Sequence, residues 1–433
     1  MTTTVAEISL WGTTVGAVSL EGNASIATFQ YTPQFTKSGF EISPIMMPLN
    51  QRVYSFPTLS QATFHGLPGL LADSLPDKFG NALIDAWLTS QGRIPASFNA
   101  VERLCYTGAR GMGALEYAPT IGSLFRASRR IEIDALVALA SATLNDKNKL
   151  QSSFSNLENK TAMQDILRVG TSAGGARAKA VIAWNRATNE VRSGQVKADS
   201  GFEYWLIKFD GVANNKDKEL ADPLGFGELE YAYALMAKAA GITMSECRLL
   251  EENGRCHFMT RRFDRDNAGG KLHMQTLGAL NHFDFNQAGA YSYEQAFLTM
   301  RQLRLPPSVL LQQFKRMVFN IVARNQDDHV KNIAFLLGKD GQWQLSPAYD
   351  ITYSYNPQGA WTAQHQMSVN GKRDAFTLDD LHTCARVASI KRPAADAVIA
   401  DVRTALKGWI GYAEQAGMSS AWSAEIERKF RVI

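Results

Sequence analysis

Two aspartates, a histidine, a lysine and an asparagine stand together in the stretch RNQDDHVKNIAFLL, residues 324–337. Asp327 and Asn332 have the spacing D-x-x-x-x-N, in which a protein-kinase catalytic loop carries an aspartate base and a metal-binding asparagine. Asp328 does not have this interval to Asn332. The spacing therefore predicts that Asp327 is the residue that receives the proton of an attacking hydroxyl group.

Phosphoryl transfer also needs a further ligand for Mg²⁺, a cation on the phosphates and backbone N–H groups over them. Asp350 follows the strand-like runs IAFLL and QWQL and could return to the metal that Asn332 binds. Lys208 ends the apolar run YWLIK, from which a strand can present an ammonium group, and Glu230 on the following helical segment is its candidate partner. The stretch GTSAGGARAK, residues 170–179, supplies three glycines that allow backbone N–H groups to approach phosphate.

Each of these features also has an ordinary structural interpretation. A glycine loop is often a tight turn, a strand lysine is usually solvated, and DDHVKN is typical of a capping turn. His329 has no second histidine close to it in sequence, which favours a structural hydrogen bond over a metal site. The glycine loop also lacks the Lys-Ser/Thr of a Walker A motif. The joint interpretation depends on the order of the five features, which is that of protein kinases.

The elements that must position these residues follow from the hydrophobic pattern. Residues 5–32 read as short strands joined by turns, and an apolar face predicts a helix from about Pro76 to Gly92 after a proline-containing loop. A second helix is expected over 226–241, and helical periods prevail from 291 onward. The pattern predicts one sheet-bearing lobe against a helical one.

Composition and charge exclude several classes of protein. The 433 residues are 45% hydrophobic and 20% charged, as in a folded globular chain, and the net charge of +4 does not by itself indicate nucleic-acid binding. The four cysteines form no C-x-x-C pair. With no signal-peptide pattern and no long apolar run, we expect a cytoplasmic protein that does not enter a membrane.

Taken in order, the motifs resemble those of the HipA family of bacterial serine/threonine kinases, the toxins of type II toxin–antitoxin modules. The resemblance covers nearly the whole chain and implies an α+β, bilobal, protein-kinase-like fold. A β-rich N-terminal lobe would carry an accessory β-subdomain, and the C-terminal lobe would be mostly α-helical. The polar stretch 145–165 marks the expected boundary between domains 1–160 and 161–433. The motifs that carry the resemblance are LWGTTVGAVS, GLLADSLPDKFGNALI, GARGMGALEYAP, SAGGARAK, LIKFD, RRFDR, NQDDHVKNIAF and LSPAYD.

The resemblance implies an ATP- and Mg²⁺-dependent kinase with Asp327 as catalytic base, Asn332 and Asp350 as metal ligands and Lys208 on the phosphates. Residues 261–263 would be the hinge that meets adenine, although Arg261 stands where some members carry an acid. The nucleotide-binding residues implied by motif position are Ala173, Gly174, Gly175, Ala176, Arg177, Ala178, Lys179, Lys208, Arg261, Arg262, Phe263, His329, Val330, Lys331, Asn332, Tyr349 and Asp350.

Ser172 falls where the family carries an autophosphorylated serine. Phosphorylation there would place negative charge in a phosphate cradle and silence the kinase. The resemblance also implies a HipB-like helix-turn-helix antitoxin, operator DNA bound through that complex, and a protein substrate, in the best-known members an aminoacyl-tRNA synthetase.

Two other functions stay open. One is a kinase of a small molecule of aminoglycoside or sugar type, and the other is a non-catalytic nucleotide-binding co-repressor that acts with an antitoxin on DNA.

Overall fold

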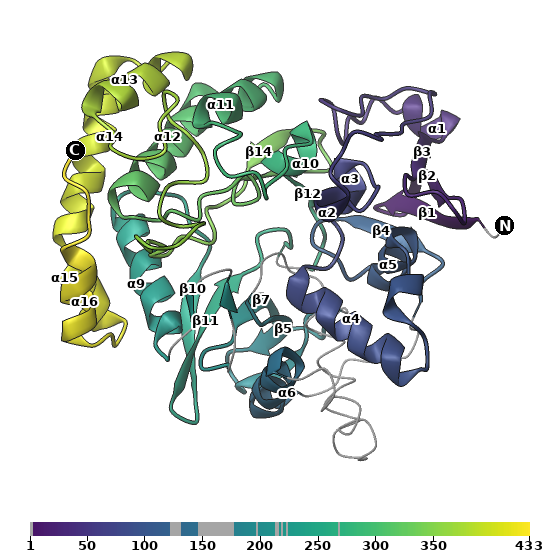
Figure 1. Cartoon of the computed structure of the whole chain (residues 1–433), viewed down its shortest axis with the longest axis horizontal. Helices are drawn as coiled ribbons and strands as arrows, with labels where there is room; N and C mark the ends of the chain where they lie inside the picture. The colour runs from purple at the N-terminus through teal and green to yellow at the C-terminus, as the bar shows by residue number, and fades with distance from the viewer. Residues whose placement is uncertain are drawn as a thin grey trace.

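The computed structural model describes residues 3–121, 131–145, 177–195, 198–212, 216–217, 220–221, 224–266 and 269–433. Figure 1 shows the N-terminal strands, in purple, on one side of the molecule and the C-terminal helices, in yellow, on the opposite side. A five-stranded sheet and the segments that carry the candidate site lie between them.

The N-terminal part is a four-stranded antiparallel sheet with the order β3-β2-β1-β4. Alternate side chains of β1 are buried, so one face of the sheet builds a hydrophobic core that α5 covers. Helix α5 begins with a capping box between Asn99 and Glu102. The elements of this part are β1 (Thr4–Leu10), β2 (Thr13–Leu20), β3 (Thr28–Tyr31), α1 (Pro33–Thr36), α2 (Gln61–Phe64), α3 (Gly69–Ala72), η1 (Pro95–Ser97), α5 (Ala100–Thr107) and β4 (Leu115–Ala118).

The central sheet is antiparallel and has the order β10-β11-β7-β5-β6. On one face, Trp205 and Ile207 of β7 pack in a core with Phe79 of α4 and Val137 of α6. On the other face, Phe258 of β11 packs with α9. The elements are α4 (Lys78–Ser90), α6 (Ile133–Asn145), β5 (Lys179–Asn185), β6 (Glu190–Ser193), β7 (Glu203–Lys208), α9 (Phe226–Ala239), β10 (Cys247–Glu252) and β11 (Arg255–Arg261), with the short pair β8 (Lys216–Asp217) and β9 (Leu220–Ala221) in a sheet of their own.

The C-terminal part is mostly helical and holds the largest hydrophobic core, built around α9, α12 and α14. Its three-stranded sheet, β12-β13-β14, lies beside the loop 325–333 that precedes β13. The elements are β12 (His273–Thr276), α10 (Leu277–Asn281), α11 (Tyr293–Gln302), α12 (Pro307–Val322), β13 (Ala334–Leu337), β14 (Trp343–Leu345), α13 (Leu378–Val387), α14 (Arg392–Lys407), α15 (Trp409–Gln415) and α16 (Ser420–Glu427).

The predicted α+β arrangement, β-rich at the N-terminus and helical at the C-terminus, is confirmed. The segment from residue 64 to α4 was predicted to be a loop, but it contains the one-turn helix α3, which is too short to give a periodic signal. The domain boundary expected at residue 160 lies outside the described residues and stays a prediction. No helix in the described ranges has the length and apolar character needed to cross a membrane.

Candidate active site

Lys208, at the end of β7, joins its strand to helix α9 and to the loop that carries Asp350. Its Nζ donates to Glu230 Oε1 of α9 at 2.6 Å and also to Asp350 Oδ1. Burial alone would raise the pKa of Asp350, but the charges of Lys208 and Lys179 hold it at about 2. The pKa of Lys208 is raised above its usual value, because its two carboxylate partners outweigh its burial. Lys208 and Asp350 are therefore both charged at neutral pH.

The loop 325–333 holds Asp327 and Asn332 by hydrogen bonds of its own backbone. Asp327 O accepts from His329 N at 3.0 Å and from Asn332 Nδ2 at 2.8 Å. The Asp327 carboxylate accepts from Trp361 Nε1 at 2.6 Å. Asp327 and Asn332 are both half-buried, so they face a partly open region at the end of the loop.

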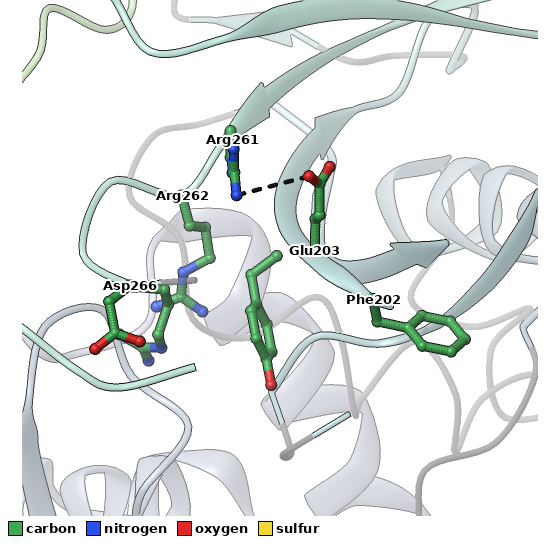
Figure 2. Close-up of a pocket in the computed structure, with 7 residues that line it drawn as sticks. Phe202, Glu203, Arg261, Arg262 and Asp266 are labelled. Atoms are coloured by element: carbon green, nitrogen blue, oxygen red, sulfur yellow. Dashed lines mark ion pairs between the residues drawn. The ribbon is translucent and has the colours of Figure 1, made fainter. Parts of the chain in front are cut away.

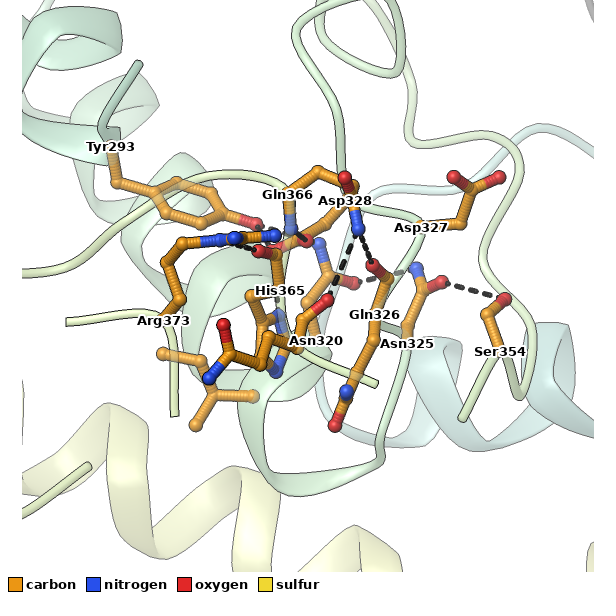
Figure 3. Close-up of polar contacts among 12 residues, drawn as sticks. Tyr293, Asn320, Asn325, Gln326, Asp327, Asp328, Ser354, His365, Gln366 and Arg373 are labelled. Atoms are coloured by element: carbon orange, nitrogen blue, oxygen red, sulfur yellow. Dashed lines mark hydrogen bonds and ion pairs between the residues drawn. The ribbon is translucent and has the colours of Figure 1, made fainter. Parts of the chain in front are cut away.

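The neighbouring Asp328 holds the loop by hydrogen bonds inside the protein. Its carboxylate is buried and accepts from Tyr293 OH at 2.7 Å, from Gln366 N at 2.8 Å and from His365 Nδ1 at 2.8 Å. Figure 3 shows this cluster, with the carboxylate of Asp327 lying apart from it. The chain thus uses one aspartate to hold the loop and leaves the adjacent one at the surface of the site.

The oxygen atoms of Asn332 and Asp350 suit a Mg²⁺ ion that is completed by a nucleotide. Because Asn332 Nδ2 donates to Asp327 O, the amide oxygen is the atom left for a cation. Within the part of the chain that the structure describes, no three His, Cys, Asp or Glu residues gather into a metal site. Mg²⁺ is commonly held by one or two protein oxygens together with phosphates and water, so the donor set fits this use.

Some of the residues after Asp327 hold the loop in place, and others are available to a bound ligand. Val330 is 1% exposed and packs in the C-terminal core, so its side chain holds the loop and does not reach a ligand. Lys331 O accepts from Tyr349 OH at 2.5 Å, and the ring of Tyr349 lies 5.5 Å from that of Phe263. The buried Nδ1 of His329 has no hydrogen-bond partner among the described residues, which leaves it available to a bound group.

The residues predicted as the hinge, 261–263, make several contacts within the protein. Arg261 forms ion pairs with Glu203 and Glu246, and Figure 2 shows the first of these at a surface pocket. The N–H groups of Arg261 and Arg262 already donate to Glu246 O and Tyr204 O. If this segment meets adenine, as predicted, Phe263 and backbone carbonyl groups would be left for the contact.

The side chain of Arg262 is also committed elsewhere. It is 1% exposed and donates to Asp264 Oδ1 at 2.9 Å and to Asp264 Oδ2 at 2.6 Å. These bonds commit Nε and Nη2 of its guanidinium group, and sequence spacing gave no sign of them because they depend on the tertiary fold. Whether Arg262 also contacts a nucleotide stays a prediction.

Part of the predicted glycine-rich loop can be placed. Arg177 lies with its guanidinium 4.3 Å from the ring centroid of Phe226, Ala178 is fully buried, and Lys179 opens β5. Ser172 and the nucleotide-binding residues predicted over 173–176 lie outside the described residues. Their roles stay predictions.

Two residues at this site were not predicted from sequence. Trp361 contacts Asp327 from a segment without regular structure, and no sequence signal indicates it. Asp77 lies 3.5 Å from Lys179 through its Oδ2 atom, and its only signal was a position ahead of a helix, which suggests a cap.

A strand lysine paired with a helix glutamate, an aspartate-asparagine loop and a later aspartate together define a site of the protein-kinase-like class. Residues 171–410, more than half of the chain, match the HipA-like C-terminal domain, and residues 6–118 match the HipA N-terminal domain. The chain belongs to the HipA family.

The chain is also similar to a solved structure and to curated proteins. A chain of the Shewanella oneidensis MR-1 HipA, HipB and operator DNA complex superposes with a TM-score of 0.68 at 16% identity, covering 98% of this chain and 95% of that one, which shows a shared fold. Sinorhizobium fredii "Putative kinase Y4mE" is 26% identical over 136 residues, and a Haemophilus influenzae "Putative kinase" is 30% identical over 139 residues. Each alignment covers 29% of this chain, and they span 32% and 40% of the two relatives.

Proposed function

We propose that this protein is an ATP- and Mg²⁺-dependent serine/threonine-protein kinase. The observation that carries the proposal is the position of Lys208, whose ammonium group joins Glu230 of α9 to Asp350 beside the Asp327 loop. In protein kinases the strand lysine pairs with a helix glutamate, and an aspartate downstream of the catalytic loop binds the metal. A purely structural ion pair would need only one carboxylate, whereas Lys208 contacts two, each from a different segment of the chain.

The chain's own residues have separate tasks in the transfer. Asp327 accepts a hydrogen bond from the attacking hydroxyl group and receives its proton as the new oxygen–phosphorus bond forms. The bond between the γ-phosphorus and the β–γ bridging oxygen breaks, and ADP is the leaving group. Lys208 holds the α- and β-phosphates, and Glu230 keeps the ammonium group in place. Asn332 and Asp350 would hold Mg²⁺, which when bound neutralises charge on the phosphates.

We further propose that the kinase acts as a growth-arresting toxin in a HipA/HipB-type module. The solved complex with a related fold contains HipB and operator DNA, and this supports a helix-turn-helix antitoxin as the partner here. The substrate would be a serine or threonine residue of a protein such as an aminoacyl-tRNA synthetase. Autophosphorylation on Ser172 would switch the enzyme off by placing a dianion against the phosphates of ATP.

The proposal is tested by incubating the purified protein with Mg²⁺ and γ-labelled ATP, alone and with a cell extract. We expect label in protein and, by mass spectrometry, phosphate on Ser172. Rapid turnover with a panel of aminoglycosides and sugars but none with proteins would favour a small-molecule kinase. Nucleotide binding without any transfer would favour a non-catalytic co-repressor.

Removing the hydrogen bond from Trp361 should speed transfer to water. The indole N–H now occupies a carboxylate oxygen of Asp327, the group that must accept a hydroxyl proton. A hydrogen bond to a charged group contributes about 1.5–3 kcal/mol, so Trp361→Phe should raise the slow hydrolysis of ATP by about ten- to a hundredfold. The matched control is Trp343→Phe, which removes an indole bond to Glu41 O and leaves the Trp361 bond to Asp327 in place. Equal rates in both variants and in the wild type would contradict the prediction.

A further inference from the structure

The segment 73–80 brings two buried carboxyl groups of the N-terminal part to the candidate site. Asp73 accepts from Thr276 N at 2.8 Å and from Thr276 Oγ1 at 2.9 Å, so it holds the start of α10. Asp77 caps α4 through Oδ1, which accepts from Gly80 N at 2.6 Å. Capping therefore accounts for one of the two carboxylate oxygens of Asp77.

The second oxygen of Asp77 has no hydrogen-bond partner in the described structure and faces Lys179. Asp77 Oδ2 lies 3.5 Å from Lys179 Nζ, and the two side chains are 4% and 3% exposed. A carboxylate buried to this degree is costly unless it is paired with a cation. Burial raises the pKa of Asp77 to about 6, although the charge of Lys179 opposes the rise.

Lys179 lies beside the lysine of the candidate site. The register pairs Lys179 of β5 directly with Lys208 of β7, so both side chains leave the same face of the sheet. Two adjacent lysines repel each other, and each is matched by carboxylates of its own: Glu230 and Asp350 for Lys208, and Asp77 for Lys179.

We propose that Asp77 is a positioning residue that holds Lys179 against the phosphates of the bound nucleotide. The inference rests on the proposed kinase function and adds to it that the N-terminal part supplies a residue to the phosphate site. A lysine side chain is long and flexible, so an ammonium group fixed before the ligand arrives binds phosphate with a smaller loss of entropy. Asp77 is itself fixed, because its other oxygen is part of the cap of α4.

Calorimetric titration of the full-length protein with MgATP and with adenosine separates this role from a structural one. Asn also caps helices, so Asp77→Asn keeps the start of α4 and removes only the charge. We expect the Kd for MgATP to rise about tenfold, the size of one lost charged contact, with the Kd for adenosine unchanged. In the kinase assay, KM for ATP should rise while kcat stays near the wild-type value.

The matched control is Asp85→Asn on the same helix, which removes a part-exposed ion pair with Arg103 and should leave both affinities unchanged. Because Asp77 is argued to act through Lys179, the double variant Asp77→Asn/Lys179→Met should bind MgATP no more weakly than Lys179→Met alone. If Asp77→Asn does not fold, Asp77→Ser takes its place, since serine also caps helices.

Three results would overturn the inference. They are equal losses for MgATP and adenosine, additive losses in the double variant, and an unchanged MgATP affinity in Asp77→Asn. In each case the kinase proposal stands if the wild type binds MgATP and transfers phosphate. A wild type that binds no MgATP would overturn the proposed function itself and this inference with it.

Discussion

Replacing Asp327 by asparagine is expected to lower the rate of phosphate transfer by about 10²–10⁴-fold, the usual contribution of a positioned acid or base. The amide retains an oxygen that can accept from Trp361 Nε1, so the loop should keep its conformation. We therefore expect the Kd for MgATP and the free energy of unfolding to stay close to their wild-type values. Single-turnover transfer of labelled phosphate measures the rate.

The adjacent aspartate provides the control. Asp328→Asn places an amide among three donors, from Tyr293, His365 and Gln366, of which it can satisfy fewer than a carboxylate does. We expect a loss of about 1–3 kcal/mol in the free energy of unfolding, because buried donors lose their acceptor. If Asp327→Asn transferred phosphate at the wild-type rate, Asp327 would not be the base.

Replacing Asp264 by asparagine is expected to lower the free energy of unfolding by about 3–5 kcal/mol, because it leaves buried arginines without their counter-charge. Asp264 is fully buried and pairs with Arg262 at 2.6 Å and with Arg265 at 2.7 Å. It also accepts from Gly113 N at 2.7 Å, which ties the N-terminal part to the segment after β11. Urea denaturation measures the loss.

The control and the pH dependence make this prediction specific. Asp199→Asn removes a pair with Arg192 whose carboxylate is 78% exposed, and it should change stability by no more than about 1 kcal/mol. Burial alone would raise the pKa of Asp264, but the two arginines hold it well below its usual range. Its stabilising effect is thus complete above the unfolded-state pKa of about 4 and decreases as the pH falls below that value. A constant difference between wild type and Asp264→Asn down to pH 2 would contradict this.

The elements of the fold were predictable where burial leaves a local signal. Helices α4 and α9 were expected because their apolar residues recur on one face, and both form within a few residues of the predicted ranges. The choice of Asp327 over Asp328 came from an interval in the sequence, and the structure separates the two residues in the same way, although their roles stay predictions.

The parts that could not be predicted depend on contacts between distant segments. Nothing in the local pattern indicates that Arg262 turns to Asp264 and to the Gly111 carbonyl, 151 residues earlier. The pairing of Asp77 with Lys179 likewise requires α4 to lie against the central sheet. Sequence identifies residue types and intervals, whereas side-chain direction follows from the packing of the whole chain.

A crystal structure with Mg²⁺ and a non-hydrolysable ATP analogue tests the central claim most directly. We expect the metal on the oxygens of Asn332 and Asp350, the phosphates on Lys208, and the γ-phosphate within reach of Asp327. A nucleotide bound elsewhere on the molecule, with the Lys208, Glu230 and Asp350 cluster unchanged and in contact with no ligand, would contradict the assignment of this site.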